Sequence, residues 1–120
     1  MNEYFTYMLR CGDGSYYTGS AAHICRRMRE HVQKEKNCAR YTRTRTVTAL
    51  SALWQSADRS AAGRLEYRIK TLTHRQKERL TAHPEELSAL LGAAVPAEAY
   101  TYVPNVTLEA CLAGRFHEGD

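Results

Sequence analysis

Residues 6–19 read TYMLRCGDGSYYTG, and this stretch decides the fold. Aromatic and aliphatic residues fill both of its ends, as is typical of β-strands. Between them, Gly12 and Gly14 can adopt the positive φ angles that a tight turn requires. The stretch therefore predicts a β-hairpin whose two strands cover residues 3–10 and 15–20.

Side chains alternate between the two faces of a strand, which groups the tyrosines of this hairpin. Tyr7 and Leu9 share a face of the first strand, and Tyr17 and Gly19 share a face of the second. Whether Tyr7 and Tyr17 face each other depends on the register of the hairpin, which the sequence alone leaves open.

A helix and a third strand are predicted after the hairpin. The helix covers residues 21–33, because apolar residues recur there every four positions, at Ile24, Met28 and Val32. Residues 34–45 lose this pattern and are predicted to form a basic loop. Residues 46–54 are rich in β-branched and apolar residues and predict the third strand.

Two longer helices follow, and their ends carry capping signals. Ser56 or Asp58 can cap the first, whose apolar stripe is Ala62, Leu65, Ile69 and Leu72. Thr73 and Gln76 have the spacing of a capping box, so a separate helix is expected from there to about Ala82. Short helices are expected at residues 84–92 and 108–113, with an extended segment at 100–103.

The predicted fold class is α/β of the α+β type, with the order β-β-α-β-α-α. A small three-stranded, mainly antiparallel sheet is flanked by helices. We expect residues 1–83 to form this domain and residues 84–120 to be a C-terminal extension. The extension is expected to pack on the same domain or against a partner chain, including a second copy.

Length and composition agree with one globular domain. The chain has 120 residues, 43% of them hydrophobic, and no stretch approaches the roughly 20 apolar residues of a membrane-spanning helix. Without a secretory signal pattern, a cytoplasmic protein is expected. The four cysteines, at positions 11, 25, 38 and 111, lack zinc-ligand spacing and are expected to be reduced thiols.

Charge divides the chain into a basic body and an acidic extension. Residues 1–83 hold 16 Lys and Arg against 7 Asp and Glu, a net charge of +9, and residues 84–120 hold one Arg against six acids, a net charge of −5. The densest cationic segment, residues 26–45, includes seven candidate nucleic-acid-binding residues: Arg26, Arg29, Lys34, Lys36, Arg40, Arg43 and Arg45. Such a cluster favours a polyanion such as nucleic acid, although a solvated charged face has the same composition.

Five positions, in order along these elements, resemble the GIY-YIG nuclease superfamily. They are Tyr7 in the first strand, Tyr17 in the run Tyr17-Thr18-Gly19, Arg27 and His31 one turn apart in the first helix, and Glu66 in the second long helix. The hairpin and the run Tyr67–Thr73 are similar to small stand-alone bacterial members. The resemblance covers residues 3–82. The leading glycine of the first motif is absent, and no asparagine follows Glu66 before Asn105.

The resemblance implies a metal-dependent endonuclease and a role for each of the five residues. Glu66 is the expected ligand for Mg²⁺ or Mn²⁺, since hard cations prefer carboxylate oxygens; otherwise it is an ordinary helix-surface residue. Arg27 is the expected phosphate clamp, or else a partner of Glu30. One of the two tyrosines is expected to deprotonate the attacking water, although both could simply pack across the strands. His31 could hydrogen-bond a tyrosine or relay a proton, or it could merely line the helix edge.

The sequence therefore predicts an endonuclease that hydrolyses phosphodiester bonds, with DNA as the expected substrate and DNA repair as a possible context. Two rival hypotheses stay open. The first is a domain that binds nucleic acid without cutting it, and the second is a protein-interaction module whose acidic extension docks a partner. The extension is expected to leave the face of Tyr17, Arg27 and Glu66 open.

Overall fold

The computed structural model describes residues 4–34, 39–92 and 95–115. The elements in chain order are β1 (Tyr4–Cys11), β2 (Tyr16–Ala21), α1 (Ile24–Val32), α2 (Arg40–Arg43), β3 (Val47–Ser56), α3 (Arg59–Lys70), α4 (His74–Ala82), the 3-10 helix η1 (Pro84–Glu86), α5 (Leu87–Leu91), the 3-10 helix η3 (Ala97–Ala99), β4 (Thr101–Tyr102) and α6 (Leu108–Leu112).

The sheet is antiparallel throughout, with the strand order β2-β1-β3-β4. The predicted α+β class with helices flanking an antiparallel sheet is confirmed, but the prediction of three strands is wrong. The fourth strand, β4, comes from the C-terminal extension and pairs with the end of β3 through Trp54 and Gln55. Two residues are too few to show a strand periodicity in the sequence, and β4 is defined by the neighbour it pairs with.

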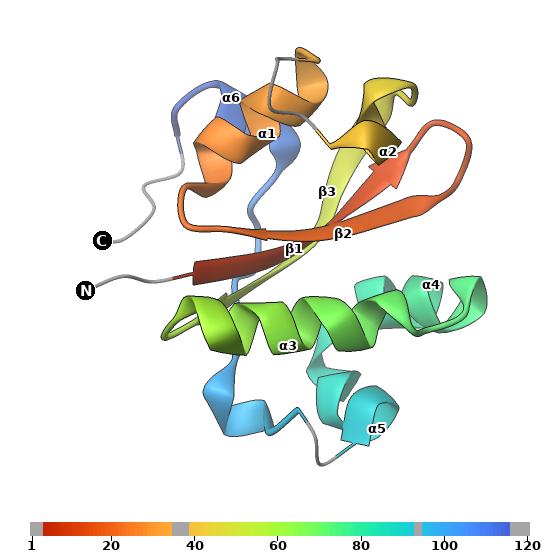
Figure 1. The fold of residues 1–120 in the computed structure, drawn as a ribbon, viewed down its shortest axis with the longest axis vertical. Coiled ribbons are helices and arrows are strands. Elements are labelled where there is room, and N and C mark those ends of the chain that lie inside the picture. The colour runs from red at the N-terminus through yellow and green to blue at the C-terminus, as the bar shows by residue number, and fades with distance from the viewer. Residues whose placement is uncertain (1–3, 35–38, 93–94, 116–120) are drawn as a thin grey trace.

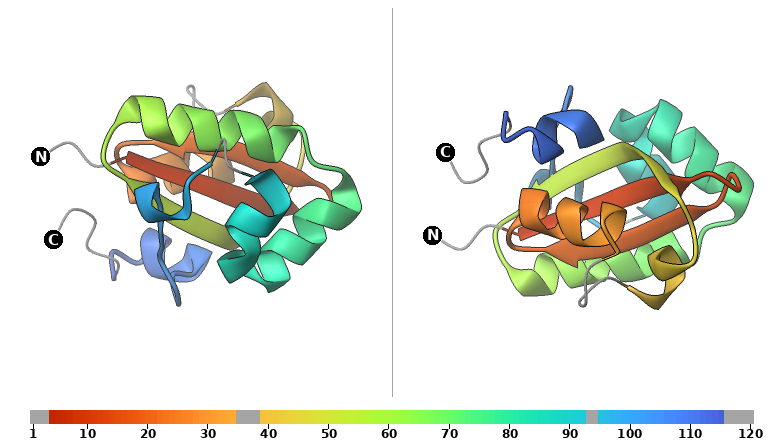
Figure 2. Two further views of the ribbon diagram at one scale, coloured as in Figure 1. Left: turned by 90° about the horizontal axis from the view of Figure 1, so that it is seen from below. Right: turned by 90° about the horizontal axis from the view of Figure 1, so that it is seen from above.

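Helices cover both faces of the sheet, which gives three layers (Figure 1). Helices α1 and α6 lie on one face, and α3, α4 and α5 lie on the other, as the two views of Figure 2 show. The cores follow this division. Phe5, Tyr7 and Leu9 of β1 face α1, whereas Met8 of the same strand faces α3 together with Trp54 of β3. The alternation of side chains along β1 thus serves two separate cores.

The C-terminal extension contributes to both cores. Leu108 and Cys111 of α6 belong to the cluster beneath α1, and Val95 and Tyr100 belong to the cluster beneath α3. The Tyr100 hydroxyl also donates a hydrogen bond of 2.6 Å to the carbonyl of Ala61 in α3. These buried contacts attach the described part of the extension to the domain. The domain boundary at residue 83 stays a prediction.

The starts of α3 and α4 follow the capping signals of the sequence. Asp58, rather than Ser56, caps α3, and its carboxylate accepts a hydrogen bond from the Ala61 N–H. Thr73 and Gln76 form the predicted capping box at the start of α4. Ser56 is instead the last residue of β3. Each cap satisfies amide groups that have no partner inside the helix.

The predicted basic loop at residues 34–45 contains one turn of helix, α2, in its described part. Lys34 lies just after α1, and its ammonium group donates to the carbonyls of Thr42 and Arg45. These hydrogen bonds hold α2 beside the end of α1. The sequence pattern missed α2 because a four-residue helix with Thr42 as its buried residue carries no apolar stripe.

Gly63 lies in the middle of α3, on the exposed side. A Cβ atom at this position would meet nothing within 4 Å, so the packing does not require a glycine. Glycine inside a helix costs about 0.5–1 kcal/mol of stability relative to alanine. The fold itself therefore gives no reason for a glycine here.

The remaining expectations concern thiols and membranes. Cys11, Cys25 and Cys111 are buried thiols, and Cys38 lies outside the described residues. Within the described part of the chain, no helix has the length and apolar character needed to cross a bilayer.

The register of the hairpin places Tyr7 directly opposite Gly19, and Leu9 opposite Tyr17. The two tyrosines are therefore diagonal neighbours, with ring centroids 6.3 Å apart. A Cβ atom at position 19 would lie 2.5 Å from the hydroxyl oxygen of Tyr7 and 2.7 Å from its Cζ. The Tyr7 ring can occupy its position only because residue 19 has no side chain.

We expect Gly19→Ala to destabilise the protein by about 1–3 kcal/mol, because the methyl group must push a fully buried ring out of place. Urea denaturation measures this change. The matched control is Gly63→Ala, which adds the same methyl group where nothing opposes it. Equal effects of the two substitutions on stability would show that Tyr7 and Gly19 are not in tight contact.

Candidate active site

Tyr7 lies at the centre of the candidate site. Its side chain is almost fully buried, with 1% of the residue exposed, and its hydroxyl is 2.7 Å from Nε2 of His31 in α1. A buried hydroxyl needs such a partner, because an unsatisfied one costs free energy. The pair ties the central strand to α1 and brings together two of the residues predicted from the sequence.

His31 is held from its other ring nitrogen by Thr42 of α2. The distance from Nδ1 to the Thr42 hydroxyl is 2.7 Å, and that hydroxyl donates to the carbonyl of Ala39 at 3.2 Å. A threonine hydroxyl has one proton, and Thr42 donates it to the carbonyl of Ala39. The Thr42 oxygen must then accept from His31, so the ring proton of His31 is assigned to Nδ1. Nε2 is then the acceptor, and the Tyr7 hydroxyl donates to it.

The pKa values in this pair favour its neutral form. Burial, reinforced by the positive charge of Arg27, lowers the pKa of His31 to about 4. Burial also raises the pKa of Tyr7, although a hydrogen bond from Arg27 acts in the opposite direction. Both groups are therefore uncharged at neutral pH in the folded protein. His31 is wholly buried, so it does not merely line the helix edge.

Arg27 lies one turn before His31 in α1, with 23% of its side chain exposed. One of its terminal nitrogens is 2.7 Å from Oε1 of Glu30, as the alternative interpretation of the sequence expected. Burial alone would lower the pKa of Arg27, but its hydrogen bonds to Glu30 and Tyr7 raise it. The guanidinium therefore keeps its charge beside the tyrosine.

Tyr17 of β2 is more accessible than Tyr7 and lies among other rings. Its ring centroid is 5.3 Å from that of His31 and 5.7 Å from that of Tyr41 in α2. The ammonium of Lys70, from α3 on the opposite layer, lies 6.0 Å from the centre of the Tyr17 ring. Tyr17 thus stands between the two layers at the edge of the sheet.

Glu66 reaches this edge from α3. Its Oε1 accepts a hydrogen bond of 2.8 Å from Ser20 of β2, and its Oε2 pairs with Lys70 at 2.7 Å. Glu66 also acts electrostatically on Tyr7, whose pKa it helps to raise. The carboxylate is partly exposed and directed to the same edge as Tyr17.

The site is built around β2 because β2 is an edge strand of the sheet. Side chains from α1 on one face and α3 on the other can meet there without passing through the sheet. The structure thus brings together all five residues predicted from the sequence, through the contacts described above for Tyr7, Tyr17, Arg27, His31 and Glu66.

The predicted cationic residues differ in their availability. Four of them are exposed: Arg26, Arg29, Arg40 and Arg43. Nε of Arg26 is 3.9 Å from Oε2 of Glu30, a long ion pair. Lys34 and Arg45 are engaged within the protein: Lys34 holds α2, and Arg45 pairs with Asp13 and stacks on Tyr41. Lys36 lies outside the described residues.

Four residues near the site were missed in the sequence: Ser20, Tyr41, Thr42 and Lys70. A signal existed only for Lys70, because a lysine four residues after a glutamate on a helix forms an ion pair. Among the described residues, one group of three potential metal ligands occurs, His83, Glu85 and Glu86 after α4, and it does not include Glu66. Glu86 is already paired there with Arg79.

The lowered pKa of His31 predicts a loss of stability in acid. His31 binds a proton near pH 6.5 in the unfolded chain but only near pH 4 in the folded protein. Stability therefore falls as the pH is lowered through this window. We expect a loss of up to about 3 kcal/mol. Denaturation of wild type and His31→Gln between pH 7 and 4.5 measures it. The variant should show a shallower pH dependence, and parallel curves would contradict the assignment.

Comparison with known proteins identifies the family. Residues 3–79 match the family model of the GIY-YIG catalytic domain. The chain is 42% identical over 92 residues to the UPF0213 protein YhbQ of Salmonella paratyphi B, covering 77% of this chain and 90% of that protein. It is 40% identical over 82 residues to the UPF0213 protein BH0048 of Halalkalibacterium halodurans, covering 68% and 84% of the two chains.

A solution NMR structure of the UPF0213 protein BH0048 from Bacillus halodurans is similar, with 32% identity, a TM-score of 0.42, and coverage of 75% of this chain and 97% of that one. The match to the family model extends over the hairpin, α1 and α3, which carry all five residues of the candidate site. The chain therefore belongs to the GIY-YIG family.

Proposed function

We propose that this protein is a metal-dependent endonuclease that hydrolyses phosphodiester bonds in nucleic acid, with DNA as the expected substrate. The observation that carries the proposal is the convergence of Tyr7, Tyr17, Arg27, His31 and Glu66 at one edge of the sheet. Family membership supports a nuclease-type function, and the metal and the choice of DNA are part of the proposal.

Arg27 suits the phosphate-binding role. Its guanidinium is charged, partly exposed and held in place by Glu30. A guanidinium presents donors in a planar fork that fits two oxygens of a phosphate. Arg27 would therefore stabilise the negative charge that develops on the phosphorus oxygens in the transition state.

The two tyrosines suit different roles. Tyr7 is buried, donates to His31 and has a raised pKa, so it positions its neighbours while remaining neutral. Tyr17 is only half-buried, at the edge where a substrate can approach. We therefore assign to Tyr17 the contact with the attacking water.

Glu66 fits one hard divalent cation. It supplies a single carboxylate, and Mg²⁺ is commonly held by one or two carboxylates with waters and substrate phosphates as the other ligands. Its Oε2 is paired with the Lys70 ammonium and is partly exposed, so it can be reached from solvent. When bound, Mg²⁺ or Mn²⁺ would neutralise charge on the phosphate and stabilise the leaving oxygen.

The proposed reaction is one hydrolysis step. The oxygen of a water held by Tyr17 forms a bond to phosphorus, and the bond from phosphorus to one sugar oxygen breaks. The proton of the water leaves through the Tyr17 hydroxyl to solvent, and the departing sugar oxygen takes a proton from solvent. Arg27 holds the phosphate throughout this exchange.

One observation favours the rival hypothesis of a domain that binds nucleic acid without cutting it. Both oxygens of Glu66 have protein partners, Ser20 and Lys70, so a metal ion would compete with the Lys70 ammonium for this carboxylate. Incubation of the protein with supercoiled plasmid, with Mg²⁺, Mn²⁺ or EDTA, separates the two. Metal-dependent conversion to open circles supports the nuclease, and binding without conversion supports the rival.

Arg27→Ala should reduce the nicking rate by about 10² to 10³-fold, because a donor directed at the phosphate is lost. DNA affinity should change little, since one cation among many is removed. The matched control is Arg26→Ala, the neighbouring arginine on α1, with 68% of its side chain exposed. Equal nicking by both variants would place Arg27 among the general surface charges.

Glu66→Gln should abolish metal-dependent nicking while the fold is retained. The amide has nearly the same shape, so it can still contact Ser20, but it is neutral and a poor ligand for Mg²⁺. Nicking is measured across a Mg²⁺ titration, with circular dichroism to monitor the fold. Glu109→Gln, an exposed change on α6, is the control. Wild-type rates in Glu66→Gln would remove this residue from the site.

A further inference from the structure

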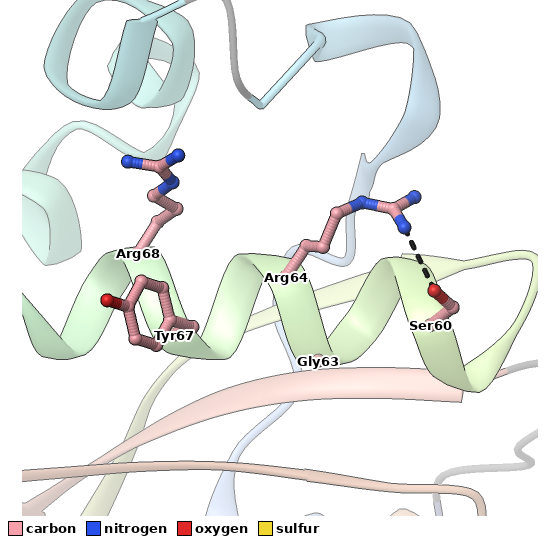
Figure 3. Close-up of a pocket in the computed structure, with 5 residues that line it drawn as sticks. All are labelled: Ser60, Gly63, Arg64, Tyr67 and Arg68. Carbon is pink, nitrogen blue, oxygen red and sulfur yellow. Dashed lines mark hydrogen bonds between the residues drawn. The ribbon is translucent and has the colours of Figure 1, made fainter.

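The outer face of α3 carries a pocket separate from the site described above. Its volume is about 380 Å³, and its lining residues are Ser60, Gly63, Arg64, Tyr67 and Arg68. All five come from the helix surface that points away from the sheet, as Figure 3 shows. The side chains of Arg64 and Arg68 rise from the same side of the helix, and the Tyr67 ring lies next to Arg68.

The two arginines of this pocket lack acidic partners. Arg64 donates to the Ser60 hydroxyl at 2.9 Å and also hydrogen-bonds the Tyr100 hydroxyl, both neutral partners. Within the described ranges neither Arg64 nor Arg68 forms an ion pair. Two uncompensated guanidinium groups one helical turn apart would attract an anion with several charged groups.

Tyr67 adds an aromatic surface beside these charges. It is 66% exposed, the most exposed of the large hydrophobic residues in the described part of the chain. An exposed tyrosine ring offers a flat face on which a nucleic-acid base can stack, and arginines beside such rings are typical of single-strand binding. A base in a duplex is already stacked and paired, so the ring would select an unpaired one.

Gly63 leaves the floor of the pocket open. The packing gives no reason for a glycine in the middle of α3, because a Cβ atom would meet no protein atom within 4 Å. A glycine that weakens the helix without a reason inside the fold is explained when a ligand approaches the helix backbone closely. Gly63 and Tyr67 are four residues apart and lie side by side on the helix surface.

The pocket is adjacent to the proposed catalytic edge. Tyr67 directly follows Glu66 and is about 100° further around α3. Lys70, which pairs with Glu66 and faces Tyr17, follows Tyr67 by three residues and lies next to it on the helix surface. A strand that leaves the edge of β2 can therefore continue over α3 along positively charged side chains.

We propose that the outer face of α3 binds a single-stranded segment of nucleic acid. A base stacks on Tyr67, the backbone phosphates contact Arg64 and Arg68, and the backbone passes over Gly63. The inference rests on the proposed function only in naming this segment as part of the substrate. It makes the protein a binder of substrates that contain an unpaired strand next to the point of cleavage.

The first test measures binding of a fluorescein-labelled 20-nucleotide dT oligonucleotide to the full chain, without divalent metal and at low salt. Tyr67→Leu and the double variant Arg64→Gln/Arg68→Gln should each bind roughly 5- to 100-fold more weakly. Tyr67→Phe keeps the ring and should retain affinity. The controls are Tyr102→Leu and Arg75→Gln, exposed residues of β4 and α4. Affinity for a duplex should fall less than for the single strand.

The second test separates binding from stability. Gly63→Leu fills the pocket where the fold has space, so the melting temperature should stay the same or rise by a few degrees, since glycine is the poorer helix former. Affinity for the oligonucleotide should nevertheless fall at least fivefold. A merely structural Gly63 could not give this combination.

The outcomes distinguish this inference from the proposed function. Unchanged oligonucleotide binding by Tyr67→Leu and Gly63→Leu, or no binding by the wild type, would overturn the inference even if the protein nicks plasmid. Weaker binding by these variants supports it even if no nicking is found. If the variants lose equal affinity for the single strand and for the duplex, the outer face of α3 is a general cationic surface, and the single-strand assignment is overturned.

Discussion

The hydrogen bond between the Tyr7 hydroxyl and His31 Nε2 is the interaction on which the rest of the structure depends. A tyrosine on the central strand points its polar end into a core, and that end needs a partner. His31 provides it, and Thr42 fixes the other side of the imidazole ring. The position of α1, the one-turn helix α2 and the absence of a side chain at Gly19 all follow from accommodating one buried phenol.

This buried chain of hydrogen bonds from Tyr7 through His31 to Thr42 gives the candidate site a rigid half and an adaptable half. Tyr7, His31 and Thr42 are enclosed and fully hydrogen-bonded, so they hold one arrangement. Across the edge of β2, Glu66 and Lys70 form a partly exposed pair that solvent screens and a substrate or cation can rearrange. The arrangement of charges is therefore fixed beside Tyr7, where Glu30 holds Arg27, and adjustable across the edge of β2.

Local signals in the sequence predicted local structure well. The apolar repeat of α1, the Asp58 cap and the capping box at Thr73 depend on residues within one or two turns, and all three are present. The five candidate site residues were named from the family resemblance, and the structure shows that they lie close together; their roles stay a prediction. The burial of His31, the helix α2 and the pairing of the extended segment at 100–103 with β3 could not be predicted, since each depends on a segment distant in sequence: α2 over His31, and β3 beside β4.

The position of β1 in the sheet has a consequence for the order of folding during synthesis. The hairpin partners of β1 lie within the first 21 residues, so β1 and β2 can pair within microseconds. The other edge of β1 pairs with β3, in which Ser56 lies opposite Tyr4 at a separation of 52 residues. Closing that loop is the slower, entropically costly step. Until β3 has left the ribosome, the nascent chain therefore presents an unpaired and apolar edge. The candidate site exists only once α3 has also been made, well after its tyrosines are in place.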